Sequence, residues 1–333
     1  MDDRGEAAGW RGVGRVVVVI LIALAGACGA ADAQADAWPT KPIRWIVPFP
    51  AAGPADILSR LLADRLAAPL GQQVVVDNRP GASGVIGTEI GVRAPPDGYT
   101  FLYGIASTIT TNQFVLKLSY DPASDLAPVS LLTRGFLLLV VRPGLPARSL
   151  AEFVALAKAR PGSLNYGSWG SGSATHLAME LFKRRAGIEI SHIPYKGSAP
   201  VLADLMASQL DVSFETTNPA LNFVRDNRIR AIAMSGAQRA PVLPDLPAIA
   251  ELYPGFEVPT WGAVLAPLGT PPAIIARMSR EIGRVMQDPV VQAKFRDLGS
   301  DPVGSPPDVL ATRIARDVET WHKVIKDAGI TAE

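Results

Sequence analysis

Short apolar segments recur along most of this chain, separated by glycine, proline and polar residues, and they follow two alternating patterns. In the first pattern, a short run of β-branched, aromatic or leucine residues predicts a buried strand. In the second pattern, apolar residues recur three or four positions apart, which predicts an amphipathic helix. The alternation of the two predicts an α/β protein with mostly parallel sheets flanked by helices on both faces.

The amino-terminal part of the chain gives this pattern clearly. Its predicted strands are Arg44–Val47, Gln73–Val76, Tyr99–Tyr103 and Leu137–Val141, and its predicted helices are Pro54–Leu70 and a second helix that ends near Val92. Pro54 suits the first turn of a helix, and Gly71 suits the position that ends one. Leu137–Val141 is apolar without interruption, which is typical of a strand covered on both faces.

The alternation then starts again, which predicts a second α/β unit. Its predicted helices are Ser149–Ala159, Ser173–Ala186 and Ser198–Ala207, and its predicted strands are Leu164–Gly167, Glu189–Ile193, Leu210–Glu215 and Ile229–Met234. Phe256–Ala266 predicts a strand that leads back to the first unit. Three tail helices are expected to pack on that first unit, at Ala273–Met286, Pro289–Leu298 and Pro307–Ala328.

Two crossings between the units predict a hinge of two strands and a cleft between two lobes. One lobe is expected to consist of residues 38–141 plus 260–333, and the other of residues 142–259. Without the predicted signal the chain has about 300 residues, a length that suits two domains rather than one.

The amino terminus has the features of an export signal. Basic residues precede the apolar run Val16–Ala27, whose 12 residues suit a signal peptide and are too few to span a membrane. Cleavage near Ala35 or Ala37 would remove a signal peptide of residues 1–35 and direct the protein to the periplasm. An uncleaved anchor and a lipid on Cys28 are the alternatives.

Composition excludes several classes of function. The 32 basic and 31 acidic residues nearly cancel, and no basic run is present, so nucleic acid is not an expected partner. Cys28 is the single cysteine and falls in the signal, which excludes thiol chemistry and disulfides from a processed chain. His176, His192 and His322 are far apart in sequence, so neither a metal site nor another cofactor is expected.

The segment Trp38–Asp56 predicts a strand that runs into a glycine–proline turn and then a helix. Such a turn directs backbone N–H groups and the positive end of a helix towards one point, which favours an anion. The candidate ligand contacts here are Phe49, Ala51, Ala52, Gly53 and Asp56. Gly53 is expected to use a glycine conformation and to let the ligand approach the backbone. For Asp56, a structural role at the helix start explains the residue better than a ligand contact does.

A loop rich in serine and glycine is the second candidate site. Its candidate contacts are Tyr166, Ser168, Ser171, Gly172, Ala174, Thr175 and His176. Hydroxyls and exposed N–H groups suit a carboxylate, whereas capping of the following helix explains the same serines without a ligand. The loop lacks the complete G-x-S-x-G pattern of a nucleophile elbow, and no paired base is evident from the sequence.

Further candidates lie at the ends of other predicted strands, where clefts form in open α/β sheets. They are Ser107, Thr108, Tyr195, Lys196, Glu215 and Thr216. Tyr195 suits a partly hydrated pocket, because it combines an aromatic ring with a hydroxyl. Lys196 is equally consistent with an ordinary solvated side chain.

Five segments, taken in order, resemble the substrate-binding proteins of tripartite tricarboxylate transporters, the Bug family. They are WPTKPIRWIVPFPAAGPAD from Trp38, NRPGASG from Asn78, YGSWGSGSATH from Tyr166, HIPYKGSAP from His192 and WGAVLAPLGTPP from Trp261. The sequence departs from the family pattern at Ala52, where glycine is common, and at Ile109, where histidine is frequent. The segment Glu215-Thr216-Thr217-Asn218 also stands where an aspartate with small residues is more usual, and these departures leave the identity of the ligand open.

The resemblance implies a periplasmic binding protein of type II architecture that covers essentially the whole mature chain. It implies a monomer without catalytic activity, which captures a small organic acid between two lobes and delivers it to the permease subunits of a tripartite tricarboxylate transporter. Opposed helix N-termini would bind the carboxylates. A two-lobed α/β hydrolase and an interaction protein without a ligand are the alternatives.

Overall fold

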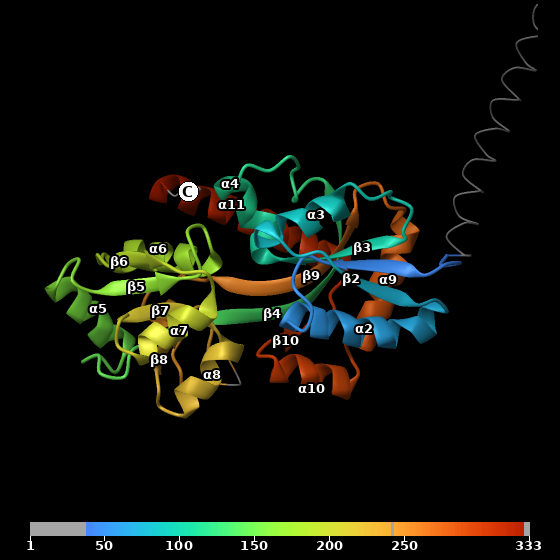
Figure 1. The fold of residues 1–333 in the computed structure, drawn as a ribbon. Helices are drawn as coiled ribbons and strands as arrows, with labels where there is room; N and C mark the ends of the chain where they lie inside the picture. The colour runs from blue at the N-terminus through green and yellow to red at the C-terminus, as the bar shows by residue number, and fades with distance from the viewer. Residues whose placement is uncertain (1–37, 241–242, 330–333) are drawn as a thin grey trace, which may run out of the picture.

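The computed structural model describes residues 38–240 and 243–329 and has a mixed α/β fold (Figure 1). One curled sheet has the strand order β2-β1-β3-β9-β4-β7-β5-β6, with β8 and β10 pairing to β4. Helices cover both faces of the sheet (Figure 1). The molecule has two halves, each with its own strands and helices. The predicted signal peptide at residues 1–35 lies outside the described residues.

The first half is built from both ends of the described chain. It contains the strands β1 (Ile43–Val47), β2 (Val74–Asn78), β3 (Thr100–Ile105) and β10 (Asp301–Pro302), the helices α2 (Pro54–Leu70), α3 (Val85–Val92), α4 (Asn112–Val115), α9 (Pro272–Val285) and α10 (Pro289–Asp297), and the single turns η1 (Ala82–Gly84) and η2 (Ser107–Thr111). The predicted helix Pro54–Leu70 is confirmed, with Gly71 at φ +70° as the residue that ends it.

The second half is built from the middle of the chain. It contains α5 (Leu150–Ala159), β5 (Asn165–Ser168), α6 (Ala174–Ala186), β6 (Ser191–Pro194), α7 (Ser198–Met206), β7 (Val212–Thr216), α8 (Thr217–Arg225), β8 (Arg230–Met234) and η3 (Ile249–Glu251). The helix α8 is an addition to the predicted elements. Within each half the expected parallel pairing is present, between β1 and both β2 and β3, and between β5 and both β6 and β7.

Two long strands, β4 (Leu126–Val141) and β9 (Pro259–Pro267), connect the halves (Figure 1). They pair antiparallel with each other, and β9 also pairs antiparallel with β3 and β4 with β7. The sequence predicted only Leu137–Val141 of β4, and this boundary was wrong. Two register shifts interrupt the pairing of β4 with β9, and they break the alternation that would have revealed the longer strand.

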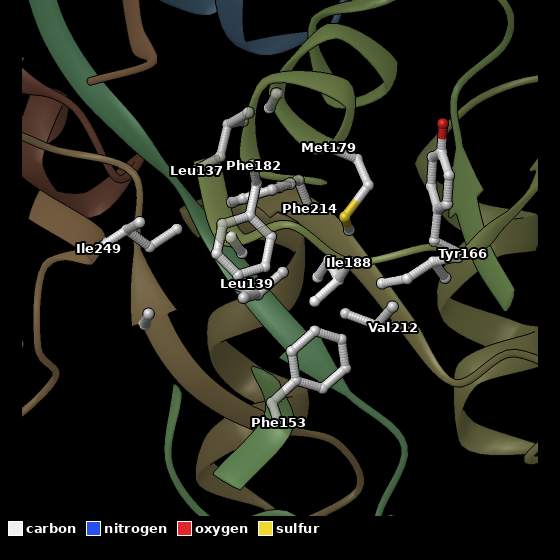
Figure 2. Packing of buried hydrophobic residues seen from close by; sticks show 14 of the residues in the cluster. Leu137, Leu139, Phe153, Tyr166, Met179, Phe182, Ile188, Val212, Phe214 and Ile249 are labelled. Atoms are coloured by element: carbon white, nitrogen blue, oxygen red, sulfur yellow. The ribbon is translucent and has the colours of Figure 1, made fainter. Parts of the chain in front are cut away.

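The last residues of β4 alternate between two hydrophobic cores. Leu137, Leu139 and Val141 belong to a core that includes Phe153 and Phe182 (Figure 2). The residues between them, Leu138 and Val140, belong to a second core on the opposite face of the sheet. This explains the unbroken apolar run, because both faces of the strand are covered.

The last helix, α11 (Pro307–Ala328), extends along both halves. Leu310 and Ile314 pack in a core of the first half with Trp261. Trp321 and Ile325 pack in the main core of the second half. The tail therefore does not pack on the first half alone, contrary to expectation, because the apolar stripe of α11 is long enough to reach both. In the described residues, no helix has the length and apolar character needed to cross a membrane.

Candidate functional site

A cavity of about 550 Å³ lies between the two halves. The first half contributes Phe49, Tyr103, Ser107, Asn112 and Val115, among others. The second half contributes 169–174 and Thr216. The connecting strands contribute Thr133, Leu137, Thr260 and Trp261. A cavity with walls from both halves has the position expected of a ligand site in a two-lobed protein.

The structure brings some of the predicted site residues to this cavity and places the others outside its lining. The lining includes Phe49, Ser107, Ser171, Gly172, Ala174 and Thr216. The lining does not include Ala51, Ala52, Gly53, Asp56, Thr108, Tyr166, Ser168, Thr175, His176, Tyr195, Lys196 or Glu215. Four of these outer residues, Ser168, Thr175, His176 and Glu215, hydrogen-bond residues of the loop 169–172, which does line the cavity.

The turn before α2 is held by its own aspartate. Asp56 is buried and accepts a hydrogen bond from the Ala52 N–H at 2.8 Å and another from Arg60 at 3.1 Å. Burial raises the pKa of Asp56, but hydrogen bonds from Arg60, Ala52 and Asn78 lower it more, so the pKa lies below its ordinary value. Asp56 therefore fixes this turn and stays ionised.

The expected glycine conformation at Gly53 is wrong, because its φ of −77° is open to any residue. The left-handed residue of the turn is instead Ala52, with φ +63°. A β-carbon already occupies that position, at some conformational cost. The glycine that the family pattern commonly shows at Ala52 has a physical reason here.

The start of α6 fixes the serine–glycine loop. Ser173 caps the helix by accepting a hydrogen bond from the His176 N–H. Thr175 accepts one from the Trp169 N–H at 3.0 Å, and His176 Nδ1 accepts one from the Gly172 N–H at 3.0 Å. Thr175 and His176 therefore shape the loop from behind, while Ser171, Gly172 and Ala174 line the cavity.

A serine–histidine pair that the sequence did not reveal lies behind the same loop. Ser168 Oγ lies 2.7 Å from His192 Nε2, and the rings of His176 and His192 stack at 4.2 Å. Burial is the largest effect that lowers the pKa of His192, to about 4, so the imidazole is neutral near pH 7. Ser168 is fully buried and lies outside the cavity lining, so its hydroxyl is not presented to a ligand there.

The other predicted contacts have partners away from the cavity or face solvent. Tyr166 donates to Glu180 at 2.7 Å, and burial together with Glu180 raises the pKa of this tyrosine well above its ordinary value. Tyr195 donates to Asp204 at 2.6 Å. Thr108 Oγ1 bonds the backbone of Ile105 at 3.1 Å. Lys196 is exposed.

Glu215 is fully buried directly behind the cavity wall. Both of its carboxylate oxygens accept the indole N–H of Trp169 at 3.1 Å, and hydroxyls of Ser198 and Ser213 also donate to it. Burial raises the pKa of Glu215 to about 7 although these hydrogen bonds lower it. The carboxylate thus fixes the indole of Trp169, which lines the cavity.

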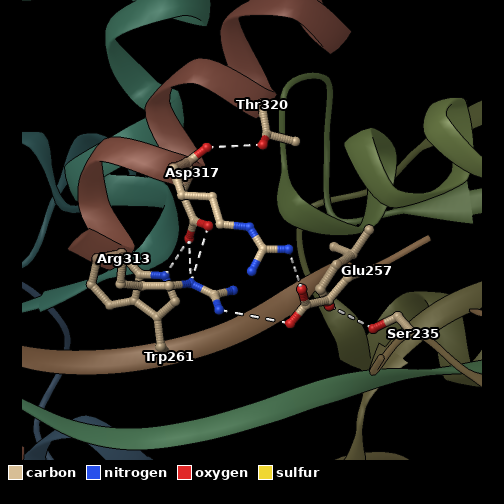
Figure 3. A network of polar contacts seen from close by, with 8 residues as sticks. Ser235, Glu257, Trp261, Arg313, Asp317 and Thr320 are labelled. Carbon is tan, nitrogen blue, oxygen red and sulfur yellow. Dashed lines mark hydrogen bonds and ion pairs between the residues drawn. The ribbon is translucent and has the colours of Figure 1, made fainter. Parts of the chain in front are cut away.

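Trp261 is fixed in a similar way from the other side. Its indole N–H donates to the buried Asp317 of α11 at 2.7 Å (Figure 3). Asp317 also pairs with Arg313, which lies 3.7 Å from Glu257 on the segment leading into β9. Burial is the main cause that raises the pKa of Asp317. This network connects the cavity wall to α11.

Sequence reasoning missed most of the lining, including the polar and aromatic residues Tyr103, Asn112, Trp169 and Thr260. It also treated Trp261 as hinge or core packing rather than as a cavity wall. Tyr103 could have been predicted as a lining residue, because it ends a predicted strand and clefts form at strand ends in α/β sheets. Trp169 also gave a signal, as a large aromatic residue in a loop of serines and glycines.

The chemistry that this lining supports is binding by neutral groups. Among the lining residues in the described part of the chain, none is an aspartate, glutamate, lysine, arginine or histidine. Residues 38–240 and 243–329 also contain no group of three side chains suited to hold a metal ion. What the cavity offers is hydroxyls, an amide, backbone N–H groups and aromatic rings.

Two α/β halves joined by two long strands, with a cavity between them, define a two-lobed solute-binding protein. Residues 58–330 match the family described as the tripartite tricarboxylate transporter family receptor, and the chain belongs to this family. Protein BugT of Bordetella pertussis is 39% identical over 318 residues, which cover 95% of this chain and 98% of BugT.

Solved structures share the fold. Rpa4515 of R. palustris, solved with adipate, is 38% identical with a TM-score of 0.77, covering 89% of this chain and all of that one. MatC of Rhodopseudomonas palustris, solved with bound malate, is 30% identical with a TM-score of 0.73, covering 86% of this chain and all of that one. The predicted family and fold class are thereby confirmed.

Proposed function

We propose that this protein is a periplasmic receptor that captures a small organic acid in the cavity between its halves and delivers it to a tripartite tricarboxylate-type permease. The observation that carries the proposal is the cavity itself, which draws its walls from both halves and from both connecting strands. The family and the acids bound by two related structures support a carboxylate as the ligand.

Helix starts and hydroxyls are the groups that would hold the carboxylate. Ala174 is the first residue of α6, and Thr216 is the cap of α8, and both line the cavity. The N-terminal N–H groups of a helix and its dipole favour an anion. Ser107 and Ser171 add hydroxyls from opposite halves. These neutral donors would bind a carboxylate without a cation.

The two halves would act as lobes that close on the ligand, one of residues 38–141 plus 260–333 and the other of 142–259. Bending would take place in β4 and β9, since these strands join the halves. Small-angle scattering should show a smaller radius of gyration when a tight ligand is added. An unchanged profile at saturation would contradict closure, unless the free protein already has the compact profile of the complex.

Processing and assembly belong to the same proposal. The signal would be cleaved near Ala35 or Ala37, and the mature receptor would act as a monomer in the periplasm. Intact-mass analysis of the periplasmic fraction should therefore give a chain that starts at Asp36 or Trp38. A retained signal, or a diacylglycerol on Cys28, would overturn this part of the proposal.

Isothermal titration with a panel of carboxylates tests the function directly. At least one acid should bind, and Ser107→Ala and Thr216→Ala should each weaken binding several-fold, because each removes about 0.5–1.5 kcal/mol of net hydrogen bonding. Ser124→Ala is the matched control, since Ser124 is exposed and lies outside the lining. Equal affinity in all three variants would locate the ligand elsewhere.

The Ser168–His192 pair gives the hydrolase alternative its one specific observation. A nucleophile must contact its substrate, whereas the Ser168 hydroxyl is buried and outside the lining. We therefore expect bound acids, esters and amides to be recovered unchanged by mass spectrometry after incubation with the protein. Turnover that disappears in Ser168→Ala would establish the enzyme instead.

A further inference from the structure

The cavity lining combines aromatic walls with hydroxyl groups and carries no charge. Four aromatic side chains line it, namely Phe49, Tyr103, Trp169 and Trp261. The described lining residues include no aspartate, glutamate, lysine, arginine or histidine. A bound acid would thus meet hydrocarbon surface and neutral hydrogen-bond donors, but no cation.

Both tryptophans direct their polar atom away from the cavity. The indole N–H of Trp169 donates to Glu215 at 3.1 Å, and that of Trp261 donates to Asp317 at 2.7 Å. Neither carboxylate lines the cavity. Since an indole has no other polar atom, each ring presents only carbon to the ligand, in a position that its hydrogen bond fixes.

These walls distinguish two kinds of acid. Carboxylates close together on a compact acid repel one another more strongly inside a protein than in water, and this lining offers no cation to offset the repulsion. When it is ionised, Glu215 adds a further negative charge behind Trp169. An apolar body, in contrast, gains free energy when it is buried against aromatic surface.

We propose that the cavity selects carboxylic acids with an apolar body, such as adipate or benzoate, over compact hydroxylated polycarboxylates, such as malate or citrate. This inference rests on the proposed function and names the ligand class of the same cavity. Trp169 and Trp261 set the preference, because they provide apolar walls that are fixed from outside. The two related structures, one with adipate and one with malate, leave both classes open for this chain.

Calorimetric dissociation constants of the wild-type protein for these four acids test the preference. Adipate or benzoate should bind at least tenfold more tightly than malate and citrate in the same buffer. Malate or citrate binding as tightly or more tightly overturns this inference and leaves the carboxylate receptor in place. Failure of every acid to bind at millimolar concentration overturns the proposed function, and this inference with it.

Variants at Trp169 test the residue that carries the argument. Trp169→Ala should weaken the binding of adipate at least tenfold. It should therefore reduce the ratio of the citrate dissociation constant to the adipate dissociation constant. Trp169→Phe keeps an aromatic ring and should retain most of the ratio. An unchanged ratio in a folded Trp169→Ala protein, checked by circular dichroism, overturns the role of this residue. If the alanine variant does not fold, the wild-type panel decides the inference.

Discussion

The free-energy cost of burying the carboxylate of Glu215 behind the cavity wall can be measured. It is fully buried, and its three hydrogen-bond donors, Trp169, Ser198 and Ser213, are all neutral. No charged group contributes to its pKa, which burial raises from 4.5 to about 7. Glu215→Gln keeps the shape of the side chain and removes the ionisation.

The sign follows from proton binding. Between pH 4.5 and 7 the folded protein keeps the proton on Glu215 while the unfolded chain has lost it, so stability falls as the pH rises through this window. The pKa difference lowers the free energy of unfolding of the wild-type protein by about 1 kcal/mol at pH 5 and by about 3 kcal/mol at pH 8.5. The stability of Glu215→Gln relative to wild type should therefore increase by about 2 kcal/mol over this range.

Urea unfolding of both proteins at several pH values between 5 and 8.5 measures this difference. The titration of groups common to the two proteins cancels in this difference. Glu189→Gln is the matched control for the loss of one negative charge, because Glu189 is exposed. The reasoning is refuted if the stability difference is the same at every pH, or if it changes equally in the control.

Three further predictions concern strain and the Trp261 network. Ala52→Gly should raise stability by about 0.5 kcal/mol in urea unfolding, because it removes left-handed strain at φ +63°; a clear loss would contradict this. Asp317→Ala should cost about 3 kcal/mol by removing the buried acceptor of Trp261, and Asp317→Asn markedly less; equal losses would contradict it. Gly172→Ala, where a β-carbon would lie 3.0 Å from a side chain of the other half, should weaken calorimetric ligand affinity several-fold, unlike Gly187→Ala at a similar φ with no atom within 4 Å; equal affinities would contradict it.

The fold was predictable where local signals and periodicity agree. The helix Pro54–Leu70 is bounded by a proline and a glycine, and its predicted limits are the observed ones. The start of β4 at Leu126 was not predictable, because two bulges shift the alternation. The reach of α11 was also hidden, since an apolar stripe does not identify the element that it covers.

The site was predictable only in its loops. Ser171, Gly172 and Ala174, which the sequence predicts as ligand contacts, line the cavity, since glycine lets the backbone itself form part of a wall. Thr175 and His176 instead bond the loop from behind, because capping uses the same residue types as ligand binding. Trp261 was predicted to be hinge or core packing, and only the meeting of distant strands places it at one cavity with Tyr103.

Glu215 shows why a costly residue can persist beside such a cavity. A carboxylate accepts hydrogen bonds at both oxygens, which matches the three donors around it, whereas a glutamine offers one acceptor oxygen and adds donors of its own. The substitution that removes the burial cost thus also gives the indole of Trp169 a weaker partner. Residues that are unfavourable for stability occur most often at functional sites. Here the unfavourable buried carboxyl group of Glu215 holds the indole of Trp169, an aromatic wall of the cavity. The stability that Glu215→Gln is expected to gain at high pH would therefore come with a less firmly held Trp169.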